Sequence, residues 1–150
     1  MKKLFTKLLI LICAVALSAT CAFALVACDS GEKFTYSGTD VKITESFDDI
    51  FDDDTYANML KTTYNNMYKG STITVSDTKL TWTIQDNASV LTVKRDGDKY
   101  ILAGDFVNQF NQNLAGGSGI DQLWYGIKTD AGFNIVMEMT GTIITISFTK

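Results

Sequence analysis

Hydrophobic and polar residues alternate one by one along most of the second half of the chain. Leu80, Trp82 and Ile84, for example, are separated by threonines. Successive side chains of a strand point to opposite faces, so this period of two predicts strands with one buried face. Turn-forming pairs such as Asp96-Gly97 separate the runs. The pattern predicts eight strands, at 41–44, 73–75, 80–84, 90–94, 100–102, 123–128, 133–139 and 142–148.

Residues 45–70 follow a helical period and carry two apolar stripes, which lie about half a turn apart at 100° per residue. One straight helix cannot bury both stripes against one core. We therefore predict two helices with a break at 52–54, a cap on the second helix at Asp54 or Thr55, and an end at Gly70. The first stripe is Phe47, Ile50 and Phe51, and the second is Tyr56, Met59, Leu60, Thr63, Tyr64 and Met67.

A third, short helix is predicted at 105–115, where Phe106, Phe110 and Leu114 follow Asp105 at helical spacing. Eight strands with one buried face form an antiparallel sandwich or a closed barrel. Closure removes exposed edges and is common for this number of strands. We therefore expect a mainly-β fold, an antiparallel eight-stranded barrel with a helix pair between the first and second strands.

The N-terminal residues differ in kind from the rest of the chain. Lys2, Lys3 and Lys7 form a basic start, and Leu8 to Val26 carry no charge. This order is typical of a secretory signal, although an apolar run of 19 residues is also near the length of a membrane-spanning helix. We interpret 1–27 as a signal peptide, 28–39 as a flexible tether rich in small polar residues, and 40–150 as the barrel domain.

Leu25-Val26-Ala27-Cys28 resembles the bacterial lipobox, in which a large aliphatic residue, a small or branched residue and a small residue precede a cysteine. The resemblance implies cleavage between Ala27 and Cys28, lipid attachment to the Cys28 thiol, and a place on the extracytoplasmic face of the cell membrane. The alternatives are a plain signal cut after Ala24 and an uncleaved anchor. Cys13 and Cys21 lie within the signal, so the exported chain would have no second cysteine for a disulfide.

Removal of the signal also changes the charge. The chain has 13 basic and 17 acidic residues, and the loss of Lys2, Lys3 and Lys7 moves the net charge from −4 to −7. Nucleic-acid binding requires a basic face, so we expect no nucleic-acid partner. The same charge argues against electrostatic docking on anionic headgroups, which leaves the lipid on Cys28 as the expected membrane attachment.

The exported residues carry no recognisable catalytic motif. The chain has no histidine, and the one cysteine outside the signal is the expected lipid carrier. Asp96, Asp98 and Glu138 could supply a carboxylate pair, but Asp96 and Asp98 flank a turn glycine, which favours turn chemistry. We expect no enzyme, no cofactor and no metal. The acidic run Asp48, Asp49, Asp52, Asp53 and Asp54 could bind calcium, but it lacks EF-hand spacing and favours negative charge at helix starts.

The order of a strand, two short helices and a run of antiparallel strands resembles the calycin barrels, especially the fatty-acid-binding proteins. The stretches 46–49 and 137–141, SFDD and MEMTG, also look like that family. The resemblance implies a helical lid over a barrel that holds a small apolar ligand. The family's last strand offers an arginine and a tyrosine to a ligand carboxylate, whereas here it reads TIITISFTK, and the only arginine is Arg95. The resemblance therefore does not imply a fatty-acid ligand. It implies a barrel of the broader lipocalin-like type.

Aromatic residues are the candidates for a ligand cavity: Trp82, Tyr100, Trp124 and Phe133. The alternative is that they fill the core, since a small barrel can be packed by its own side chains. Tyr125 follows Trp124 on a strand, so one of that pair is expected to be exposed. We expect a non-enzymatic module that binds a small hydrophobic ligand or a surface protein, or else a structural envelope lipoprotein with a filled core.

Overall fold

The computed structural model describes residues 31–45, 52–115, 123–139 and 141–150. The predicted signal peptide, the lipobox with Ala27 and Cys28, and the first predicted helix, which falls on 46–51, lie outside the described residues. Gly31–Lys150 forms one compact unit. Every described strand has both of its pairing partners within this unit. The buried core also lies wholly within it. We therefore expect the unit to fold without the residues that precede it.

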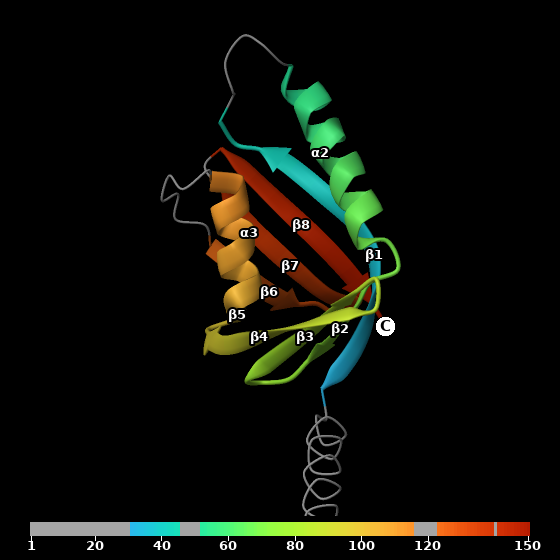
Figure 1. Cartoon of the computed structure of the whole chain (residues 1–150), viewed down its shortest axis with the longest axis vertical. Helices are drawn as coiled ribbons and strands as arrows, with labels where there is room; N and C mark the ends of the chain where they lie inside the picture. Colours follow the sequence, from blue (N-terminus) through green and yellow to red (C-terminus); the bar gives the residue numbers. More distant parts are fainter. Residues whose placement is uncertain (1–30, 46–51, 116–122, 140) are drawn as a thin grey trace, which may run out of the picture. The chain divides into compact units, whose positions relative to one another are not determined.

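The chain forms a closed antiparallel barrel, which confirms the predicted fold and excludes the sandwich (Figure 1). Neighbouring strands in sequence are neighbours in the barrel, and the last strand pairs with the first. The strands are β1 Glu32–Ile43, β2 Thr72–Val75, β3 Lys79–Ile84, β4 Asn87–Asp96, β5 Lys99–Ala103, β6 Leu123–Lys128, β7 Gly132–Met139 and β8 Thr142–Thr149.

Strand β1 begins earlier than predicted, so the tether expected over 28–39 is wrong from Glu32 onward. The first residues of β1 pair with β2, and those from Thr35 onward pair with β8. A bulge between Tyr36 and Gly38 shifts the register there. Before the bulge only Phe34 and Tyr36 alternate with polar residues, which is too short a run among small polar residues to indicate a strand.

Two helices are described. Helix α2, Asp53–Tyr68, connects β1 to β2 and packs against β1, and helix α3, Asp105–Ala115, connects β5 to β6 and packs against β4 and β5 (Figure 1). Helix α2 confirms the predicted helix before the second strand, and α3 confirms the predicted short helix at 105–115.

The cap and the buried face of α2 differ from the predictions. The cap is Asp52, whose carboxylate accepts a hydrogen bond from the Thr55 amide at 3.3 Å, so neither Asp54 nor Thr55 is the cap. The carboxylate at Asp52 occupies this place because it can reach the free amides of the first turn. The residues 52–54, predicted as a break, are thus the helix start.

The predicted apolar stripe of α2 lies partly in solvent, since Met59 is 56% exposed. Tyr64, which belongs to that stripe, and Tyr68, which does not, are the buried residues, so the buried face is rotated from the predicted one. Asn65 fixes this rotation of the helix, because its side-chain oxygen accepts hydrogen bonds from the Tyr36 hydroxyl and from the Thr39 amide, the latter at 3.1 Å. These bonds tie α2 to the β1 strand.

Candidate ligand-binding site

The barrel wall has a break beside β4. Strand β4 starts at Asn87, but β5 pairs with it only from Thr92 onward. The residues 87–91 therefore have β3 as their one strand partner within the described part of the chain. Gly104, at φ +141, turns the chain from β5 into α3 close to the Val90 carbonyl and the Leu91 backbone, where a Cβ atom would lie 3.4 Å from that carbonyl oxygen. Helix α3 thus covers the break in place of a longer β5.

A cavity of about 510 Å³ lies between the two helices and the β3–β4 hairpin. This volume is within the range of about 300–1,000 Å³ that small-molecule sites occupy. Helix α2 and helix α3 contribute apolar and aromatic side chains, and the hairpin contributes a polar rim. The lining residues are Met67, Tyr68, Ile84, Gln85, Asn87, Ser89, Phe106 and Phe110.

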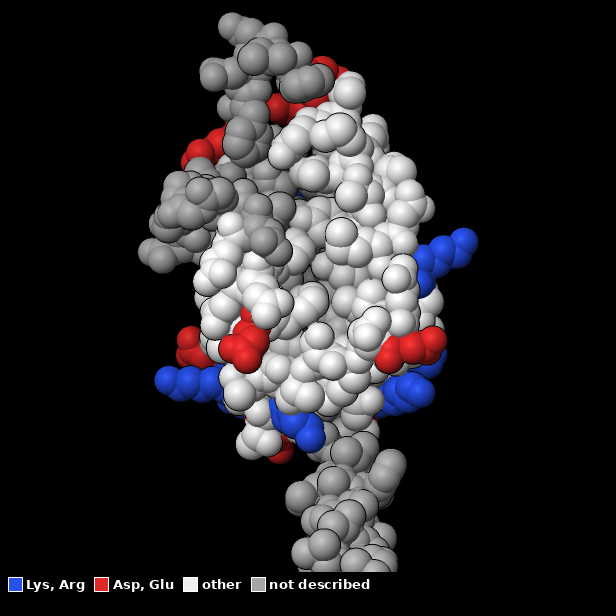
Figure 2. Space-filling model, in the orientation of Figure 1, with Lys and Arg blue, Asp and Glu red and all other residues white. Residues whose placement is uncertain are grey.

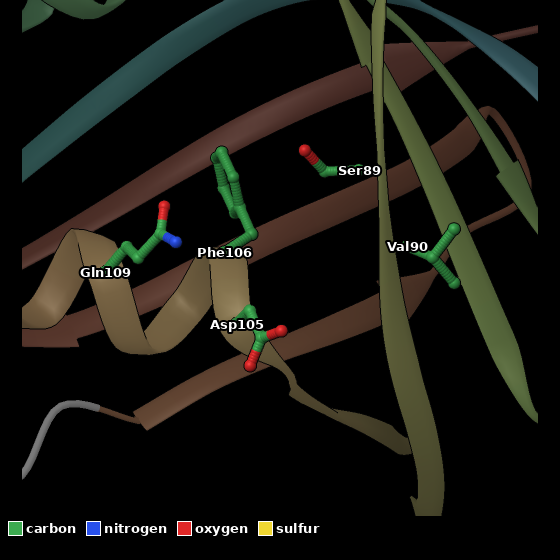
Figure 3. A pocket seen from close by; sticks show the side chains of 5 residues that line it. All are labelled: Ser89, Val90, Asp105, Phe106 and Gln109. Atoms are coloured by element: carbon green, nitrogen blue, oxygen red, sulfur yellow. The ribbon is translucent and has the colours of Figure 1, made fainter.

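A smaller cavity of about 260 Å³ adjoins it and shares Ser89 and Phe106 with it. Figure 3 shows the Phe106 ring extending from α3, with the Ser89 hydroxyl on the side of β4 that faces the ring. The Gln109 amide lies beside the ring, and the Asp105 carboxylate points away from it. This cavity is more polar than its neighbour, so together they offer an apolar chamber with a polar annex.

Two buried hydrogen-bond donors near the large cavity have no partner among the described residues: the Tyr68 hydroxyl and the Trp82 ring nitrogen. The two rings lie 4.7 Å apart between centroids, and Trp82 lies 5.6 Å from Phe106. Burial raises the pKa of Tyr68, so its hydroxyl stays a neutral donor. A buried polar group without a partner is costly, which makes these donors candidates for a ligand acceptor or an ordered water.

The hairpin at the cavity rim has an unusual backbone. Gln85 and Asp86 have φ angles of 47° and 66°, the left-handed region that side chains other than glycine and asparagine rarely adopt. Two successive left-handed residues form the tight turn that matches the twist of a two-residue hairpin. The turn places Gln85 in the wall of the large cavity.

The four aromatic residues predicted to line a cavity are fully or almost fully buried and belong to one core cluster. None of them lines either of the two cavities above. Phe133 packs against Phe34 and Tyr100, with centroid distances of 6.0 and 5.4 Å, at the end of the barrel where β1 begins. Trp124 donates a hydrogen bond from its ring nitrogen to the Asn111 side chain at 3.1 Å. Trp82 and Trp124 lie just behind the lining of the large cavity, because Trp82 packs against Tyr68 and Trp124 packs edge-on against Phe110 at 4.9 Å.

The expectation that Trp124 or Tyr125 is exposed is wrong, because Trp124 and Tyr125 are 1% and 6% exposed. Tyr125 faces outward, where its hydroxyl donates to the Glu138 carboxylate at 2.6 Å and the Lys99 ammonium lies 4.0 Å from its ring centroid. Desolvation and the hydrogen bond to Glu138 raise the pKa of Tyr125 to about 12. Long polar side chains thus cover the ring on the outer wall.

The carboxylates considered for catalysis are not brought together. Asp96 lies next to the β4–β5 turn and pairs with Lys99 of β5. Lys99 pairs with Ile127 of β6, which pairs with Asn134 of β7, so Asp96 is level with Asn134. Glu138 is four residues further along β7 than Asn134 and bonds Tyr125. No group of three histidine, cysteine, aspartate or glutamate side chains within the described ranges is placed to hold a metal ion. Of the acidic run, Asp53 and Asp54 lie in the first turn of α2, as charge at a helix start requires.

Charge is distributed unevenly over the barrel. The cations Arg95 and Lys128 lie at the end where β1 begins. Arg95 lies over the Tyr100 ring, 4.2 Å from its centroid, and Lys128 forms an ion pair with Glu32. Figure 2 shows basic residues near the end where β1 begins, at the bottom of the view, and a largely uncharged face between the helices. The large cavity is lined by no charged residue, and Asp105 is the charged residue in the lining of the small one.

None of the helices in the described part of the chain is long and apolar enough to cross a membrane. Comparisons with protein-family models, with curated proteins and with solved structures gave no match.

Proposed function

We propose that this protein is a lipid-anchored, non-enzymatic binding module of the bacterial cell envelope. Its ligand would be a small, mainly apolar molecule held between α2, the β3–β4 hairpin and α3. The observation that carries this proposal is the cavity of about 510 Å³, whose lining is mostly apolar and aromatic. Sites for small molecules combine such a lining with a few polar groups, and here Ser89, Asn87 and the unpaired Tyr68 hydroxyl supply them.

The anchor is supported by the basic start, the uncharged run and the Cys28 motif. Three residues separate Cys28 from the start of β1 at Glu32, a reach of roughly 10 Å when extended. The β3–β4 hairpin lies at the opposite end of β3 from Lys79, and the register places Glu32 level with Val75 and thus with Leu80. The hairpin that lines the cavity therefore lies at the other end of β3 from the residues that are level with Glu32.

The binding proposal is tested with residues 29–150 and the uncharged fluorescent probe N-phenyl-1-naphthylamine. Saturable binding is expected for the wild type. Ser89→Phe should weaken it at least about tenfold, because Ser89 lines both cavities. Ala88→Phe is the matched control, since Ala88 is exposed and points to the other face of the same strand. Equal binding by both variants, or none by the wild type, contradicts the proposal.

The anchor is tested separately by growth with labelled palmitate. The wild type should be labelled and Cys28→Ser should not, whereas equal labelling of both refutes lipid attachment at Cys28.

A structural envelope lipoprotein without a ligand is the second candidate. The observation that favours it is the aromatic packing around Phe133, which leaves that end of the barrel filled. Native mass spectrometry of the purified unit separates the candidates. A co-purifying small-molecule mass supports ligand binding, and a bare protein that also leaves the probe unbound supports the structural role.

A further inference from the structure

The two cavities contain hydrogen-bonding groups but no cation among their lining residues. Ser89, Gln109 and Asp105 line the small cavity, and the exposed Asp105 carboxylate lies at its edge, pointing away from the Phe106 ring (Figure 3). Ser89 and Gln109 can donate and accept, whereas an ionised carboxylate only accepts. A ligand group placed among the three is therefore best matched if it can donate a hydrogen bond to Asp105.

Three cations of the described barrel, Arg95, Lys128 and Lys99, are engaged away from the cavities. Arg95 lies over the Tyr100 ring, and Tyr100 packs edge-on against Phe133 in the filled end of the barrel. Lys128 pairs with Glu32, and Lys99 lies over the outward-facing Tyr125. These three positions are near the end where β1 begins, and the cavities are beside the β3–β4 hairpin at the other end.

We propose that the site selects amphiphiles whose polar end is an uncharged or cationic hydrogen-bond donor, such as an alcohol or an amine, and disfavours carboxylates. The inference rests on the proposed binding function and specifies its ligand class. The apolar chain would occupy the large cavity beside Phe110 and Met67, and the polar end would pass Phe106 into the small cavity next to Asp105.

The charge of the ligand decides the selection. The neutral donors Tyr68 and Trp82 can hydrogen-bond an alcohol oxygen as well as a carboxylate oxygen, so they do not favour an anion over an alcohol by themselves. A carboxylate that enters finds no cation among the lining residues and lies near the Asp105 carboxylate, whose repulsion is screened because Asp105 is exposed. An alcohol carries no such cost, and a primary ammonium is attracted to Asp105.

The experiment uses residues 29–150 with bound N-phenyl-1-naphthylamine at pH 8, displaced by 1-decanol, decylamine or decanoate. These ligands share one chain length and differ in the polar end. Decanol and decylamine should displace half of the probe at concentrations at least about tenfold below that of decanoate, which corresponds to about 1.4 kcal/mol.

Asp105→Asn removes the carboxylate without changing the size of the side chain. It should improve displacement by decanoate and weaken displacement by decylamine, each by about threefold, and leave decanol nearly unchanged. Asp86→Asn is the matched control, because Asp86 is exposed in the hairpin and lines neither cavity. It should change none of the three ligands by more than a small factor.

The outcomes separate the two levels of the proposal. If the probe binds and decanoate displaces it as well as decanol does, the selection for non-acidic ligands is refuted while ligand binding stands. If Asp105→Asn and Asp86→Asn have the same effect on decanoate and decylamine, the role of Asp105 is refuted. If the folded wild type does not bind the probe or any of the ligands, the binding function itself is contradicted, and the inference with it.

Discussion

The two ends of this barrel are built from the same kind of strand but are filled differently. At the end where β1 begins, Phe133 packs between Phe34 and Tyr100, and Gly126 lies directly against the Phe133 ring. We call this group the filled end. At the other end, which we call the open end, the aromatic residues Tyr68, Phe106 and Phe110 surround a cavity of about 510 Å³. The difference separates residues that stabilise the fold from residues that are free to bind.

The length of one strand produces this difference. Strand β5 has five residues and β4 has ten, so strand pairing closes the wall next to β4 only from Thr92 onward. A helix covers the remaining part, and helix side chains do not interlock with a sheet edge as a paired strand does. The break in the wall is therefore where the space for a ligand arises.

The largest expected effect on stability is at the filled end. Phe133→Ala should lower the free energy of unfolding by about 3–5 kcal/mol, because the ring is 1% exposed and its removal leaves a void among packed aromatics. Urea unfolding measures this change. Phe110→Ala, at the half-buried edge of the open end, should cost clearly less. Equal losses for the two variants would contradict the distinction between the ends.

A smaller loss is expected when a methyl group is added at the filled end. A Cβ atom at Gly126 would lie 2.2 Å from the Phe133 ring, so Gly126→Ala should cost about 1–3 kcal/mol through overpacking. Phe133→Leu provides room, and the double variant should therefore lose less than the sum of the single variants. Strict additivity in urea unfolding would show that the contact between Gly126 and Phe133 does not exist in solution.

At the open end, removal of a polar atom should stabilise the empty protein. Tyr68→Phe deletes a buried hydroxyl that has no partner among the described residues, and we expect a gain of about 1 kcal/mol in the free energy of unfolding. A loss of stability in urea unfolding would mean that the hydroxyl is already hydrogen-bonded in the ligand-free protein.

The smallest effect on the free energy of unfolding is expected in alkaline solution. It concerns Tyr68 of the open end and Tyr125 of the outer wall. The pKa of Tyr125 is raised to about 12, mainly by desolvation and then by Glu138, and burial raises the pKa of Tyr68. A raised pKa means that the unfolded chain releases its proton first. Their contribution to stability is therefore complete below about pH 10 and is lost as the pH rises through about 12.

Unfolding free energies measured between pH 9 and pH 12, with Tyr68→Phe and Tyr125→Phe for comparison, test this expectation. Each substitution should flatten the decline relative to the wild type. A decline that neither substitution changes would show that both hydroxyls ionise at the ordinary pKa of tyrosine.

Strand number, barrel closure and α3 followed from the sequence, because alternation and helical spacing are local signals. Residues 32–40 of β1 did not, because only Phe34 and Tyr36 alternate with polar residues there, within a segment of small polar residues typical of a tether. The buried face of α2 was predicted only in part. Tyr64 is buried as expected, but the burial of Tyr68 depends on Asn65, whose partners Tyr36 and Thr39 are remote in sequence.

The binding site was hidden for a similar reason. Its residues come from four separate elements, and the space between them depends on where β5 stops pairing with β4. Phe106 and Phe110 were visible as the apolar side of a short helix, but no local pattern distinguishes a residue beside a cavity from a residue in the core. Size and aromatic character pointed to Phe133 and Trp124, which are core residues.

The most direct test of the account is to observe both ends in one spectrum. Methyl NMR of residues 29–150, labelled at isoleucine and methionine methyl groups, reports Met67 and Ile84 in the open end and Ile135 in the core of the barrel. Saturation with N-phenyl-1-naphthylamine should shift the resonances of Met67 and Ile84 through the ring currents of the probe and leave Ile135 nearly unchanged. Shifts of Ile135 as large as those of Met67, or unchanged Met67 and Ile84 resonances at saturation, would contradict the claim that the open end is the binding site.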